Sequence, residues 1–213
     1  AIINDCLVNK NADAISEEIL EQGSKVFKNW AKTSETPKFA FLETPAWPEA
    51  DIGAKNAIET AITSLSSACQ RERLPDPFNK IIDYHAAVFA AENSHYYGPF
   101  LDNHSELLSE KLRARLIVSK TTLASEYIAA LNARDKIYHS LEALLDDYDA
   151  VLCLAATGAA PIGFETTGSA IFNGLWTYLG VPCLSLPLLT TENMPLGLQL
   201  VGKRGNERKL FKT

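Results

Sequence analysis

No stretch of the sequence is apolar over the roughly 18 residues that a membrane-spanning helix requires, and no signal peptide is recognisable. The four cysteines are scattered, without a Cys-x-x-Cys pair, and none of the four histidines stands at metal-ligand spacing. We therefore expect no membrane partner and no metal site. We interpret the cysteines as buried, reduced thiols of a cytoplasmic protein.

Basic residues are too few and too dispersed for nucleic-acid binding. The chain has 20 Lys and Arg residues against 26 Asp and Glu, a formal net charge of -6. Phosphate binding needs a concentrated basic patch. The nearest groupings, residues 111–115 and 203–212, are mixed with acidic or apolar residues and are interpreted as solvated faces. The sequence therefore predicts no nucleic-acid partner.

The composition is that of an ordinary globular protein, with 46% hydrophobic and 22% charged residues in 213 positions. The first eight residues already follow an apolar-periodic pattern without a preceding cap, and residues 207–211 resemble the start of a helix. These features predict that residues 1–213 are part of a single larger domain.

The pattern of apolar residues indicates an α/β fold, because predicted helices surround a few buried strands. Short apolar runs predict strands over residues 39–42, 150–154, 181–186 and 196–201, and residues 69–73 are expected to form a short edge strand that Pro75 and Pro77 stop. Amphipathic segments predict helices over residues 54–68, 78–94, 106–117, 121–145 and 172–179, with another helix ending near residue 8 and one beginning at Ser16. Residues 155–169 are rich in Gly, Ala, Pro and Thr and are expected to form a loop.

Turn-forming residues give more specific expectations near the carboxyl terminus. Gly180 is expected to end the helix over residues 172–179 as a C′ glycine. Pro182 and Pro187 bracket the strand that follows. Gly197 within an apolar strand indicates a bulge or a close approach of two backbones, and Asn173 is a candidate cap for the short helix.

An ordered set of short motifs resembles the C-terminal signature of the amidase-signature family. Agreement begins earlier, with the strand 39–42 and the Thr44–Trp47 segment that reads Thr-Pro-Ala-Trp, and covers nearly the whole chain in the expected order. The motifs are Thr167-Gly168, Phe172-Asn173, Trp176-Thr177, Gly180-Val181-Pro182, the strand ending at Pro187, and Met194-Pro195-Leu196-Gly197-Leu198-Gln199-Leu200-Val201-Gly202.

The resemblance implies a mixed central sheet flanked by helices, here as the incomplete C-terminal portion of the amidase-signature fold. It also implies an amide hydrolase with a Lys-Ser-Ser triad, whose Gly/Ser-rich loop supplies backbone N–H donors to the oxyanion. No Gly-Gly-Ser-Ser-Gly-Gly run occurs here, and the adjacent Ser66-Ser67 is expected inside a helix facing solvent. We therefore expect no catalytic residues in this sequence, an N-terminal catalytic part outside it, and an inactive segment.

The substrate contacts that this half could provide are predicted on and after the loop over residues 155–169. That loop follows a buried strand, and ligands of open α/β sheets gather near the carboxyl ends of strands. Tyr96 and Tyr97 are weaker candidates. The predicted substrate-binding residues are Thr166, Thr167, Gly168, Phe172 and Trp176, with core packing as the alternative for the two aromatic residues.

Three functions remain open from the sequence. The first is part of an amidase hydrolysing a linear non-peptide C–N bond in a small carboxamide. The second is an amidase subunit or domain of the glutamine-amidotransferase or allophanate-hydrolase type. The third is a non-catalytic interaction domain derived from the fold. No cofactor is expected, because no metal or nucleotide motif appears, and an unpaired sheet edge would favour self-association into a homo-oligomer.

Overall fold

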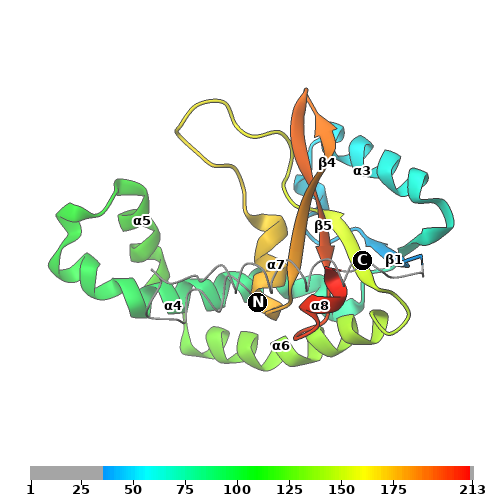
Figure 1. Ribbon diagram of the computed structural model, residues 1–213. Coiled ribbons are helices and arrows are strands. Elements are labelled where there is room, and N and C mark those ends of the chain that lie inside the picture. Colours follow the sequence, from blue (N-terminus) through cyan, green and yellow to red (C-terminus); the bar gives the residue numbers. More distant parts are fainter. Residues whose placement is uncertain (1–35, 212–213) are drawn as a thin grey trace, which may run out of the picture.

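The computed structural model describes residues 36–211. The helices predicted near residue 8 and from Ser16 lie outside these residues. The described chain forms a five-stranded sheet in the order β2-β1-β3-β5-β4 (Figure 1). Its strands are β1 (Phe39–Leu42), β2 (Cys69–Glu72), β3 (Ala150–Leu154), β4 (Cys183–Thr191) and β5 (Met194–Val201).

The sheet is mixed, as the family resemblance implied. Strand β1 runs parallel to both β2 and β3, whereas β5 runs antiparallel to β3 and β4. Val151, Leu184 and Leu198 therefore lie in one sheet. Every residue of β1 and β3 is buried, which explains why both read as continuous apolar runs rather than as alternating patterns.

Helices cover both faces of this sheet (Figure 1). Helix α3 contacts β2, β3 and β4, while α7 packs with α4 and α6 on the other side. The helices are α3 (Ile52–Leu65), α4 (Ile81–Asn103), α5 (Glu110–Ser119), α6 (Ala124–Leu144), α7 (Ile171–Leu179) and the short α8 (Glu207–Leu210).

Several helices begin or end at other residues than predicted, and local contacts explain two of these differences. Helix α4 continues past Ser94 and through Pro99 to Asn103, where the Asn103 side chain donates a 2.9 Å hydrogen bond to the Pro99 carbonyl oxygen. Helix α6 begins at Ala124 rather than residue 121, because the Glu126 carboxylate accepts a 3.0 Å hydrogen bond from the Leu123 N–H. Helix α5 is likewise displaced toward the carboxyl terminus from the predicted range 106–117.

Strand β4 is longer than predicted because it continues through a β-bulge into a hairpin. Its register with β5 shifts between Leu186 and Leu189, around Pro187. The hairpin turn is made by Glu192 and Asn193, both with positive φ (52° and 61°). Two such residues form the turn that suits the twist of a tight hairpin. Gly180 ends α7 with a φ of 61°, which confirms its predicted role.

Candidate functional site

The loop over residues 155–170 leaves the sheet at the carboxyl end of β3 and projects away from it before returning to α7 (Figure 1). Three contacts hold its base. The Ala155 N–H donates to the Gly197 carbonyl oxygen (3.1 Å), and the Asp51 N–H donates to the Thr157 carbonyl oxygen (2.7 Å). The Asn173 side chain donates to the Ala155 carbonyl oxygen (3.0 Å). Strand β5, the turn before α3 and helix α7 therefore fix where the loop starts.

Close packing around this base explains two glycines. A Cβ on Gly197 would lie 2.4 Å from the Ser185 hydroxyl oxygen and 2.7 Å from the Ala155 Cβ, so the predicted close approach at Gly197 is confirmed. A Cβ on Gly158 would lie only 1.8 Å from the Asp51 carboxylate. Larger residues at either position would push the loop away from its anchors.

The far part of the loop is exposed over residues 161–170, and beside its polar residues it carries the fully exposed apolar side chains of Ile162 and Phe164. Thr166, Thr167 and Gly168 are all exposed and lie next to one another in an irregular segment just before α7. The Gly168 N–H donates to the Thr166 hydroxyl (3.1 Å) and the Ile171 N–H donates to the Ser169 hydroxyl (3.3 Å). Because each hydroxyl oxygen accepts from the backbone, its own O–H remains able to donate to another group.

A second anchor holds the loop on the side of α5. The Lys111 ammonium donates a 2.5 Å hydrogen bond to the Glu165 carbonyl oxygen. Gly168, with a φ of 87°, provides the left-handed turn that leads the chain back toward α7. The loop therefore bridges the carboxyl edge of the sheet and α5.

Phe172 and Trp176, the two aromatic candidates, are core residues. Their relative exposures are 0% and 1%, and the Trp176 ring meets Phe78 edge-on with centroids 6.3 Å apart. The packing alternative describes their place in the structure, and they orient α7 rather than offer surface to a ligand. The weaker candidates Tyr96 and Tyr97 lie on α4 and are exposed.

Beneath the loop lies a series of hydrogen-bonded side chains that was not predicted from the sequence. The Gln199 side-chain amide donates to the Asn173 side-chain oxygen (2.8 Å) and accepts from the Cys153 thiol (3.5 Å). Gln199 is buried, and burial raises the pKa of the Cys153 thiol, so Cys153 is an inert structural thiol. Asn173 does not cap α7, because it lies inside the helix and Ala170 occupies the cap position. The one sequence feature that could have indicated these contacts is Gln199, a single polar residue within the apolar run of β5.

The adjacent serines and two of the histidines lie in unrelated parts of the described fold. Ser66 and Ser67 are exposed, but they form a 3-10 turn between α3 and β2 rather than a helix interior, and Ser66 has a φ of 51°. His139 contacts Glu142 on α6, and His85 packs against Gly174. Within residues 36–211 no group of three or more His, Cys, Asp or Glu side chains could hold a metal ion.

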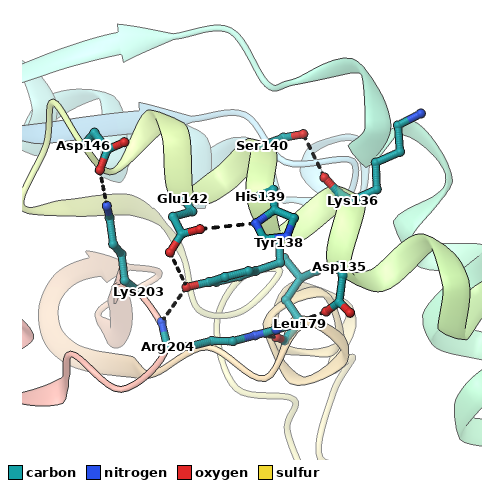
Figure 2. A network of polar contacts seen from close by, with 10 residues as sticks. All are labelled: Asp135, Lys136, Tyr138, His139, Ser140, Glu142, Asp146, Leu179, Lys203 and Arg204. Carbon is teal, nitrogen blue, oxygen red and sulfur yellow. Dashed lines mark hydrogen bonds and ion pairs between the residues drawn. The ribbon is translucent and has the colours of Figure 1, made fainter.

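A polar network joins α6, the end of α7 and the residues after β5 (Figure 2). Arg204 donates from Nε to the Leu179 carbonyl oxygen (2.8 Å), pairs with Asp135 (3.2 Å) and stacks over the Tyr138 ring at 3.9 Å from its centroid. The Tyr138 hydroxyl in turn donates to Glu142 at 3.3 Å. A guanidinium at the carboxyl end of α7 complements the helix dipole, so this network is structural.

None of the described helices has the length and hydrophobicity needed to cross a membrane. The profile of the family described as Amidase matches residues 1–211. The A subunit of glutamyl-tRNA(Gln) amidotransferase from Thermotoga maritima is 29% identical over 241 aligned residues, which cover 96% of this chain and 47% of that protein. Its counterpart from Nitratiruptor sp. is 28% identical over 134 residues, covering 58% of this chain and 30% of that protein.

Solved structures agree in fold. A crystal structure of an amidase superposes with a TM-score of 0.75 at 22% identity, covering 85% of this chain and 45% of the other. The crystal structure of the Thermotoga maritima amidotransferase protein gives a TM-score of 0.59 at 24% identity, with 83% and 40% coverage. The chain thus spans about half the length of these relatives or less. Since the family profile covers almost every residue and the sheet matches solved amidases, this chain belongs to the amidase family.

Proposed function

We propose that the chain is the C-terminal part of an amidase that hydrolyses the linear, non-peptide C–N bond of a small carboxamide. The reactive Ser and its Lys base would belong to polypeptide outside this sequence. The observation that carries the proposal is the loop over residues 155–170, anchored at the carboxyl end of β3 with exposed hydroxyls. This is the edge at which open α/β sheets bind ligands.

In this proposal the loop forms one wall of the substrate cleft. Thr166 and Thr167 would hydrogen-bond the amide group of the substrate, and Gly168 would allow a close approach, since it carries no side chain. Phe172 and Trp176 would act from the core by fixing α7, which follows the loop. Positioning of this kind lowers the barrier by holding the amide in a productive geometry for an activated nucleophile.

The experiment uses the longer polypeptide that contains this chain. Ammonia release is measured from a panel of carboxamides, and Thr166→Ala and Thr167→Ala are compared with the unchanged protein. We expect KM to rise or the order of preferred amides to change, because a hydrogen bond to substrate is worth about 0.5–1.5 kcal/mol. Thr177→Ala, on an exposed position of α7, is the matched control. Unchanged kinetics in both loop variants would show that Thr166 and Thr167 do not contact the substrate.

A second candidate is the amidase component of an amidotransferase. It is favoured by the curated relatives, which belong to glutamyl-tRNA(Gln) amidotransferases. In this case glutamine would be the amide, and ammonia would pass to an acceptor held by another subunit. Glutamine hydrolysis that accelerates when the other subunits are added together with an aminoacylated tRNA would select this candidate over a free-standing amidase.

A further inference from the structure

Ala155, the first residue of the loop over residues 155–170, is held from two sides. Its N–H donates to the Gly197 carbonyl oxygen of β5 (3.1 Å), and its own carbonyl oxygen accepts from the Asn173 side chain of α7 (3.0 Å). The Ala155 Cβ also lies only 2.7 Å from the place that a Cβ on Gly197 would take, so β5 and the loop are already in close contact there. Strand β5 therefore fixes one side of Ala155, and Asn173 fixes the other.

The orientation of the Asn173 amide is set at both ends of a series of hydrogen bonds. The Cys153 thiol donates to the side-chain oxygen of Gln199 (3.5 Å), which leaves the Gln199 nitrogen to donate to the Asn173 oxygen (2.8 Å). Burial raises the pKa of the Cys153 thiol, so the proton that begins this series is retained. A backbone carbonyl oxygen can only accept, so the Asn173 nitrogen is the group that faces Ala155.

The contact between Asn173 and Ala155 closes the loop. Asn173 lies in the first turn of α7, the helix to which the loop returns, and Ala155 is the residue at which the loop leaves β3. Fixing the two ends of a loop to each other limits the conformations that its middle can adopt. The exposed residues 161–170, which include the candidate hydroxyls, lie between these two ends.

The oxygen and the nitrogen of the Asn173 amide have different functions. The oxygen accepts from the buried Gln199 and so contributes to folding, whereas the nitrogen donates to the loop. Asn173 is itself exposed, so a carboxylate at this position would stay in contact with water. An aspartate would keep an oxygen for Gln199 but would replace the donor with a second oxygen, which repels the Ala155 carbonyl oxygen. One substitution can therefore release the loop without removing the contact that stabilises the fold.

We infer that Asn173 is a positioning residue of the proposed amidase: by closing the loop at Ala155, it sets where the exposed hydroxyls of the loop meet the substrate. The inference rests on the proposed function for the identity of the reaction. Asn173 acts through the loop, so its loss should weaken the binding of those carboxamides that the loop hydroxyls contact.

Steady-state kinetics of the longer polypeptide test this with two variants of Asn173. Asn173→Asp and Asn173→Ala both lose the donor, so both should raise KM about three- to tenfold for the best substrate among acetamide, benzamide and glutamine, as the loss of one hydrogen bond does. Urea should unfold Asn173→Ala at a lower concentration than Asn173→Asp, because only alanine also removes the acceptor of Gln199. A KM within about twofold of the unchanged protein in Asn173→Asp would overturn the inference.

The added charge has a matched control on the same helix. Thr177→Asp places a carboxylate on another exposed position of α7 and should leave KM unchanged. A KM that rises equally in Thr177→Asp and Asn173→Asp would assign the effect to charge, and the inference would fail.

A double-substitution cycle shows whether Asn173 acts through the loop. When Thr166 and Thr167 are both alanine, the hydroxyls that the loop positions are absent. Adding Asn173→Asp to that protein should then change KM by less than about twofold. The same factor in both backgrounds would show that Asn173 affects the substrate by another route, which contradicts the inference.

Hydrogen exchange separates this inference from the proposed function, because it requires no turnover. The amides of Ala155 and Asp51 are both bonded at the base of the loop. They should exchange at least about threefold faster in Asn173→Asp than in Thr177→Asp. Faster exchange in a protein that releases no ammonia would support the anchoring of the loop by Asn173 and reject the proposed function. An active amidase in which Asn173→Asp leaves this exchange unchanged would do the reverse.

Discussion

The Gln199 side-chain amide donates a 2.8 Å hydrogen bond to the side-chain oxygen of Asn173, and so connects β5 to α7 beneath the candidate loop. The Asn173 side chain also donates a hydrogen bond to the carbonyl oxygen of Ala155, the first residue of the loop. A buried polar residue is costly unless its hydrogen bonds are made. This pair therefore stabilises the fold and fixes the loop at the same time.

Replacing Asn173 with Ala should lower the free energy of unfolding by about 1–3 kcal/mol, because the side-chain N–H of the buried Gln199 loses its acceptor. Denaturation by urea measures the change. Thr177→Ala, an exposed position one turn further along α7, should change stability by no more than about 0.5 kcal/mol. Equal stability of the two variants would show that the Asn173–Gln199 contact contributes nothing.

Gly174 lies against His85 where α7 crosses α4. A Cβ at Gly174 would lie 2.7 Å from the His85 ring, so Gly174→Ala should destabilise the protein by about 1–3 kcal/mol through overpacking. In a His85→Ala background the ring is gone, and the same substitution should become stabilising by up to about 1 kcal/mol, the difference in helix propensity. Denaturant titrations in which Gly174→Ala destabilises both the unchanged protein and the His85→Ala variant would show that the His85 ring is not what Gly174 accommodates.

The pH dependence of stability should carry a contribution from His85. Burial lowers the pKa of His85 in the folded protein. The unfolded chain therefore binds a proton more readily, so stability should fall as pH decreases through about 6.5, the ordinary histidine value, toward the lower folded pKa. Melting temperatures from pH 8 to 5 should fall less steeply in His85→Gln. Identical slopes for both proteins would exclude His85 as the source.

We expect Arg204 to stabilise the fold chiefly through its contacts at the end of α7 and less through its ion pair with Asp135. Arg204→Ala loses the hydrogen bond to Leu179 and the stacking on Tyr138, and should cost about 2 kcal/mol. Asp135→Ala removes only an exposed partner and should cost less than about 0.5 kcal/mol. Unfolding measurements that rank the two variants in the opposite order would contradict this division.

Much of the fold could be predicted because it depends on local patterns. Strands β1 and β3 follow from apolar runs, β2 from the prolines that stop a short segment after it, and the end of α7 at Gly180 from turn chemistry. The length of β4 could not be predicted, because it depends on a bulge at Pro187 and on a turn made by Glu192 and Asn193. The pair Glu-Asn is not among the two-residue sequences that signal a tight hairpin. The end of α4 depends on contacts around Pro99 that a linear pattern does not show.

The candidate site could be predicted only in part. The exposure of Thr166, Thr167 and Gly168 follows from the composition of the loop, and their contact with a substrate stays a prediction. The burial of Phe172 and Trp176 does not, because aromatic residues on a short helix suit either a pocket or a core. The contact of Gln199 with Asn173 joins positions 26 residues apart, and only the packing of α7 on the sheet brings them together.

We propose that the reactive centre lies outside these 213 residues. The decisive experiment measures ammonia release by the purified 213-residue chain and by the longer polypeptide, at equal concentration and with the same carboxamides. We expect turnover by the longer polypeptide and no turnover above the uncatalysed reaction by the shorter chain. Turnover by the shorter chain that disappears when one of its own residues is substituted would contradict it.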